Sequence, residues 1–165
     1  MTNRTLDLQV RCRAAQVLGR CGFDNQTNLD ILAWSVADLT VETAFAFSGG
    51  NTNRNNPMWA QCGWSLYSAF HHQVTAEAAG SPPSLPKGFL NRAAKSQVVR
   101  SAYTEGVGLM AHLMFNRSPA PKAELGKLFT WVQANRPANF TFDPACPALP
   151  APAAPAQQAA PANGG

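Results

Sequence analysis

Few residues in this 165-residue chain have the types and spacing that metal binding requires. His71 and His72 are adjacent, so on a helix their side chains diverge by about 100 degrees and do not converge on one ion. His112 lies far along the chain, and no C-x-x-C or H-x-x-x-H pair occurs. We therefore predict no metal site and no cofactor.

Nucleophilic catalysis finds equally little support. Gln61-Cys62-Gly63-Trp64-Ser65 shares part of the sequence around the nucleophile of papain-like proteases, but it lacks the second cysteine, which is the nucleophile there. Cys62 also falls within a helical packing pattern. The chain contains no G-x-S-x-G elbow, Walker loop or G-x-G-x-x-G fingerprint. We predict that the protein is not an enzyme.

Basic side chains in two separate segments are the strongest remaining candidates for function. If the first helix lies beside residues 87–100, they would line one track of phosphate-binding positions, and such binding is independent of base sequence. The predicted nucleic-acid-binding residues are Arg4, Arg11, Arg13, Arg20, Lys87, Arg92, Lys95 and Arg100. Ordinary solubilising charge is the alternative interpretation.

An acidic segment separates these basic ones, since residues 21–53 hold four acidic side chains and no basic one. This dipolar pattern suits head-to-tail stacking of subunits or a nucleic-acid groove. Asp38 and Glu42 share a helical face, and Trp64 lies off the packing stripe of its helix. The predicted protein-interface residues are Asp30, Asp38, Glu42 and Trp64. A solvated acidic face is the alternative for the carboxylates.

Hydrophobic periodicity predicts that helices position these residues. The expected helices cover residues 3–21, 28–47, 57–79, 96–115 and 121–134, with a break or a separate turn at 89–95. The first buries an apolar line formed by Leu6, Val10, Ala14, Val17 and Cys21. The second opens with a capping box at residues 27–30, and Asn56-Pro57 opens the third.

The helix at 96–115 is expected to be the one on which the others pack. Its stripe consists of Val99, Ala102, Tyr103, Gly106, Met110, Leu113 and Met114. Gly106 lies within this stripe, which predicts close approach of another backbone. The fold class is therefore all-α, a compact bundle of about five helices.

Amino-acid composition indicates how the chain divides into domains and in which cellular compartment we expect the protein. We expect residues 1–137 to form the helical bundle and residues 138–165, which are rich in Pro and Ala, to form a low-complexity tail. Only 13% of residues are charged, against a typical value near 25%, so we expect a partner to cover part of the surface. No secretory signal and no run of about 18 apolar residues is present, and the scattered cysteines are expected to be free. We expect a cytoplasmic protein.

Three segments resemble the small helical subunit of multi-subunit CRISPR effector complexes of the type III and type IV kinds. They are RTLDLQVRCRAAQVLGR in the first helix, GVGLMAHLMF in the core helix and LGKLFTWVQAN in the last. The resemblance implies a non-catalytic subunit that stacks with copies of itself in a ribonucleoprotein. Its basic surface would hold guide RNA or target nucleic acid. A structural subunit of a viral or bacterial shell is the main alternative, and an enzyme is the third.

Overall fold

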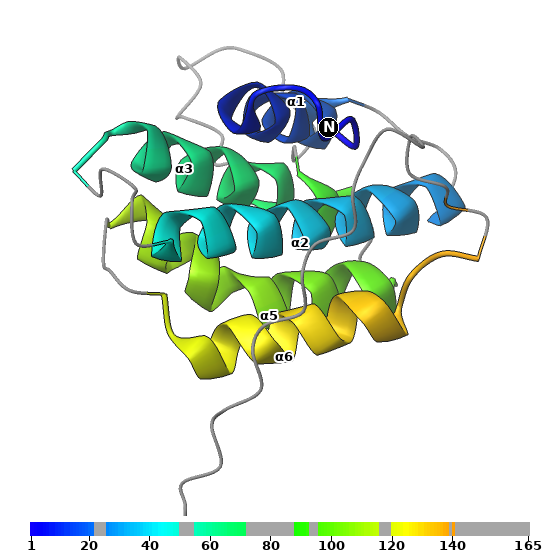
Figure 1. The fold of residues 1–165 in the computed structure, drawn as a ribbon. Coiled ribbons are helices and arrows are strands. Elements are labelled where there is room, and N and C mark those ends of the chain that lie inside the picture. The colour runs from blue at the N-terminus through cyan, green and yellow to red at the C-terminus, as the bar shows by residue number, and fades with distance from the viewer. Residues whose placement is uncertain are drawn as a thin grey trace, which may run out of the picture.

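The computed structural model describes residues 1–21, 26–49, 55–71, 88–92, 96–115, 120–138 and 140. In these ranges six helices and no strand are present. The helices are α1 (Leu8–Arg20), α2 (Gln26–Ser48), α3 (Met58–Phe70), α4 (Phe89–Arg92), α5 (Gln97–Met114) and α6 (Lys122–Ala134). The predicted all-α bundle of about five helices is confirmed, with α4 as the separate turn expected at 89–95. Figure 1 shows α1 and α6 at opposite ends of the bundle, with α2, α3 and α5 between them.

Helix α5 packs against α2, α3, α4 and α6, as predicted for the organising helix. Ser96 caps it, because its Oγ accepts a hydrogen bond from the Val99 backbone N–H at 3.1 Å. The prediction that another backbone approaches Gly106 closely is wrong. A Cβ there would lie 3.1 Å from Met110 Cε and 3.7 Å from Leu128 Cδ2, so side chains and not a backbone fill the space beside it.

Helix α2 is the second central element. Its apolar residues lie on almost every side, and most are buried, which is typical of a core helix. The buried Trp34 donates its indole N–H to the Val132 carbonyl of α6 at 2.8 Å. Among the described helices, Thr27–Ser48 is long and apolar enough to cross a membrane, with a mean hydropathy of 1.2. Because 67% of that window is buried inside the bundle, packing accounts for its composition.

The boundaries of three helices differ from those expected. Helix α2 begins at Gln26, so Thr27 lies inside its first turn and is not the N-cap. Asn56 does cap α3, accepting from the Met58 N–H at 2.9 Å. Residues 72–79 of the expected third helix lie outside the described residues, as do residues 51–54 and 141–165. Helix α1 begins at Leu8 with Asp7 as its cap, so Arg4 precedes the helix.

The orientation of α1 is opposite to the one predicted. Leu6, Val10 and Val17 are 47%, 54% and 57% exposed, and the buried residues of α1 are instead Arg11, Cys12, Ala15 and Gly19. A Cβ at Gly19 would lie only 2.5 Å from the Ala69 carbonyl oxygen of α3. Small residues therefore let α1 approach α3 at backbone distance, and valines on that face would hold the helices apart.

Candidate nucleic-acid interface

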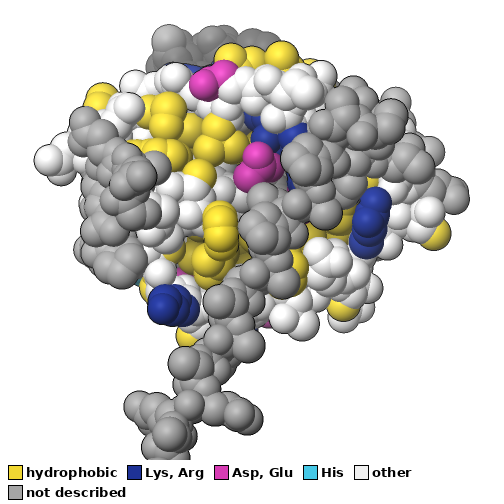
Figure 2. All heavy atoms as spheres, viewed as in Figure 1, with side chains coloured by type: hydrophobic (Ala, Val, Ile, Leu, Met, Phe, Trp, Pro, Cys, Tyr) yellow, Lys and Arg dark blue, Asp and Glu magenta, His cyan; other side chains and the backbone are white. Residues whose placement is uncertain are grey.

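Two of the predicted phosphate-binding arginines lie inside the protein. Arg11 donates from Nη1 and Nη2 to the two carboxylate oxygens of Glu42 at 2.5 and 2.6 Å, and from Nε to the Met1 carbonyl at 2.9 Å. Arg4 donates to Asp38 Oδ2 at 3.1 Å, and its Nε lies 3.8 Å from Glu42. Figure 2 shows basic and acidic side chains adjoining one another between α1 and α2.

This ion-pair cluster corrects both sets of sequence predictions. Arg4 and Arg11 do not line an exposed track, because they neutralise Asp38 and Glu42 of the same chain. Burial nevertheless outweighs Arg4 and raises the pKa of Asp38 above its ordinary value. Asp30 also has a partner within the chain, since its Oδ1 accepts from Ser96 Oγ at 2.6 Å and so anchors the start of α5 on α2.

Three predicted cations remain on the described surface: Arg13, Arg20 and Arg100 are exposed. Arg13 donates to Gln16 Oε1 at 3.2 Å on its own helix. Lys87 and Lys95 lie outside the described residues. Arg92 ends α4, and only its backbone is described.

Two contacts set the register of α1 on α3. Gln9 Nε2 donates to Gln61 Oε1 at 2.6 Å near the start of both helices. Gly19 meets Ala69 near the end of both. The two helices therefore run parallel, and each residue of α1 lies beside the α3 residue about fifty positions later.

This register fixes the level of each α1 cation along α3. Arg13 falls at the level of Trp64, and Arg20 falls at the level of His71. The pKa of Cys62, two residues before Trp64, is lowered mainly by its hydrogen bond with Cys12 and to a smaller extent by the charge of Arg13, so Arg13 lies within electrostatic range of this part of α3. Trp64 is 52% exposed, in agreement with its position off the packing stripe, and its role at an interface stays a prediction.

An aromatic cluster surrounds Trp64. The ring of Tyr67 lies edge-on to Trp64, with centroids 6.1 Å apart, and stacks on His71 at 5.5 Å with an interplanar angle of 14°. Tyr103 of α5 contacts His71 at 5.3 Å and Tyr67 at 6.4 Å. We call these four residues, Trp64, Tyr67, His71 and Tyr103, the aromatic face.

The core fixes the position of the aromatic face. The Tyr103 ring lies 5.7 Å from buried Phe70, so the inner edge of the face rests on the interior. Burial, with a smaller contribution from Tyr67, raises the pKa of Tyr103, and its phenol therefore stays neutral. A partly exposed set of aromatic rings held against a rigid core, with exposed arginines on the neighbouring helices α1 and α5, can stack planar groups and contact anions.

Sequence reasoning located one member of the aromatic face and missed three. Trp64, Tyr67 and His71 follow i, i+3, i+7 spacing, which places them on one side of a helix. That spacing is visible in the sequence, but Tyr67 also fits the packing stripe of its helix. Tyr103 comes from another helix, and only the antiparallel packing of α3 and α5 brings it to this face.

The described residues contain no arrangement typical of a metal site, because no three His, Cys, Asp or Glu side chains there are grouped closely enough to hold an ion. Cys12 and Cys62 are buried free thiols that face each other across the α1–α3 contact. The hydrogen bond with Cys62, together with burial, raises the pKa of Cys12 above the ordinary range, so this thiol stays protonated.

Comparison of the chain with protein-family models, with curated proteins and with solved structures found no match.

Proposed function

We propose that this protein is a non-catalytic subunit that holds single-stranded nucleic acid on the aromatic face. The observation that carries the proposal is the 52% exposed Trp64, supported by Tyr67, His71 and Tyr103, with Arg13 and Arg20 at matching levels of α1. Single-stranded binders combine these two components, aromatic rings for bases and cations for phosphates.

The arrangement favours binding that is independent of base sequence. Stacking on an aromatic ring contributes about 1–3 kcal/mol per base and tolerates every base, because each has a π face. Arg13 and Arg20 are separated by two helical turns, or about 10 Å along α1, which is close to the span of two nucleotides. Arg100 is exposed and lies one turn before Tyr103 on α5, so it supplies a further cation on the helix that contributes Tyr103.

This role agrees with the resemblance to small helical subunits of CRISPR effector complexes, which implies a non-catalytic protein that assembles with copies of itself. Exposed apolar residues in and just before α1 supply a surface for such assembly, namely Leu6, Val10 and Val17. The same residues favour the alternative of a shell subunit, whose contacts would be with protein alone.

The salt dependence of binding tests the proposal. Fluorescence anisotropy with a 20-nucleotide uridine RNA would be measured over a range of salt concentrations. Removing one cation that binds a phosphate of a single strand reduces the slope of log affinity against log salt by about 0.7. We expect Arg13→Gln and Arg20→Gln each to weaken binding and to flatten the plot by about this amount.

Lys122→Gln is the matched control, because it removes one exposed positive charge at the start of α6, outside the proposed site. Equal losses of affinity for Lys122→Gln and Arg13→Gln would overturn the assignment of the site. Purified protein that forms large particles with no absorbance excess at 260 nm, and that binds neither RNA nor DNA, would favour the shell alternative.

A further inference from the structure

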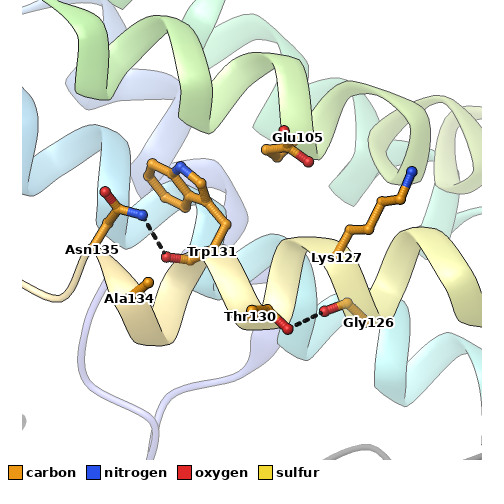
Figure 3. A pocket seen from close by; sticks show the side chains of 7 residues that line it. All are labelled: Glu105, Gly126, Lys127, Thr130, Trp131, Ala134 and Asn135. Carbon is orange, nitrogen blue, oxygen red and sulfur yellow. Dashed lines mark hydrogen bonds between the residues drawn. The ribbon is translucent and has the colours of Figure 1, made fainter.

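A shallow hollow lies between α5 and α6, at the far end of the bundle from α1. Its volume is about 620 Å³, and it is lined by Glu105, Gly126, Lys127, Thr130, Trp131, Ala134 and Asn135. Figure 3 shows the indole of Trp131 and the side chains of Glu105 and Lys127 facing the space between the two helices. This hollow is separate from the aromatic face.

Trp131 combines an apolar surface with a hydrogen-bond donor. Its backbone carbonyl accepts from Asn135 Nδ2 at 2.9 Å. In the part of the chain that the structure describes, its indole N–H has no acceptor. The Thr130 hydroxyl already has an acceptor within α6, since its Oγ1 donates to the Gly126 carbonyl at 2.9 Å. A ligand with a flat apolar side and a carbonyl acceptor would satisfy both parts of Trp131.

The C-terminal segment of the same chain has this chemistry. Pro144, Pro147 and Pro150 recur every third residue, in the sequence PACPALP. A polyproline II helix has three residues per turn, so these three prolines share one side of it, and its carbonyls are free to accept hydrogen bonds. Aromatic-lined surfaces recognise proline-rich segments of this kind through the same two features.

The last described residue places this segment near the hollow. Phe140 packs edge-on against Trp34, with centroids 4.9 Å apart, and Trp34 is hydrogen-bonded to Val132 of α6. The chain therefore leaves the bundle beside the last turn of α6, where Ala134 and Asn135 line the hollow. Four further residues reach Pro144 and span up to about 14 Å.

The proline segment also matches the hollow in length and in charge. The six steps of a polyproline II helix from Pro144 to Pro150 extend about 19 Å, and the nine steps of α6 from Gly126 to Asn135 extend about 14 Å. Glu105 and Lys127 give the hollow no net charge. The side chains after Asp143 carry no charge, so neither partner must leave a charge unpaired.

We propose that the segment Pro144–Pro150 binds, as a polyproline II helix, to the Trp131 hollow of its own chain. The prolines pack on the indole ring, and a tail carbonyl accepts the hydrogen bond from Trp131 Nε1–H. A short tether gives an effective concentration in the millimolar range, so even weak intrinsic affinity suffices. The proposal is independent of nucleic-acid binding, because it uses a different surface.

Hydrogen exchange of the Trp131 indole N–H in the full chain tests this proposal. The signal is identified by its absence in a Trp131→Phe variant. If the effective concentration exceeds the dissociation constant tenfold, docking slows exchange about tenfold. The triple variant Pro144→Ala, Pro147→Ala and Pro150→Ala should lose this protection and shift the signal, while the other indole signals stay in place.

The triple variant Pro152→Ala, Pro155→Ala and Pro161→Ala is the matched control, because it removes the same number of prolines from the sequence beyond the proposed segment. It should leave the Trp131 signal unchanged. Equal effects of both variants, or no effect of the first, would overturn the proposal. Protection that increases with protein concentration would show that the tail of another copy is the occupant and would overturn docking within one chain.

Discussion

Arg11 of α1 and Glu42 of α2 form a bidentate ion pair with hydrogen bonds of 2.5 and 2.6 Å, and Arg11 is only 2% exposed. A buried guanidinium is tolerated only when a carboxylate and further acceptors surround it. The pair therefore fixes which side of α1 faces the bundle, and it leaves Val10 and Val17 outside.

Removing one partner of this pair should destabilise the protein strongly. Glu42→Gln leaves the buried charge of Arg11 without a full counter-charge, so the free energy of unfolding in urea should fall by about 3–5 kcal/mol. The double variant Arg11→Met, Glu42→Leu replaces both charges with apolar side chains and should recover most of the loss. A change below about 0.5 kcal/mol for Glu42→Gln would contradict the buried ion pair, because that is the range of ordinary surface substitutions.

Two glycine substitutions should change stability in opposite directions. Gly19→Ala places a methyl group 2.5 Å from the Ala69 backbone, which cannot move cheaply, so we expect a loss of about 1–3 kcal/mol. Gly126→Ala meets nothing within 4 Å in the middle of α6 and should gain about 0.5–1 kcal/mol. Thermal unfolding of both variants measures this, and equal shifts would show that α1 does not rest on α3 at backbone distance.

The raised pKa of Asp38 predicts a pH effect of definite sign. Because its folded pKa lies above the ordinary value of 3.8, the stability that Asp38 contributes is fully present below pH 3.8 and is lost as pH rises through the folded pKa. Relative to an Asp38→Asn variant, the wild type should therefore lose stability across that range. Carbon-13 titration of the carboxyl group checks the pKa directly, and titration below pH 3.8 would reverse the prediction.

The central part of the fold could be predicted because apolar periodicity alone determines it. In α5 and α6, Val99, Leu113, Leu128 and Val132 follow helical spacing and are buried as expected. The orientation of α1 could not be predicted in this way. There, backbone contact at Gly19 and the ion pair of Arg11 outweigh the burial of two valines, and neither interaction is visible before α2 and α3 are in place.

The candidate site was predictable only in part for the same reason. Exposure of Trp64 followed from its position off the packing stripe. The sequence does not show which arginines are buried, because Arg4 and Arg11 are held inside by Asp38 and Glu42, which only the fold brings within reach. Tyr103 joins the aromatic face through tertiary packing, and no spacing within one helix encodes that.

The affinity of a Trp64→Ala variant for single-stranded RNA tests the central proposal most directly. Loss of one stacked base costs about 1–3 kcal/mol, so the dissociation constant should rise about 5- to 150-fold, and Trp64→Phe should retain part of the affinity. Phe45→Ala removes an exposed aromatic ring of α2, outside the aromatic face, and should bind like the wild type. Unchanged affinity in a folded Trp64→Ala variant would contradict the proposal that bases stack on the aromatic face.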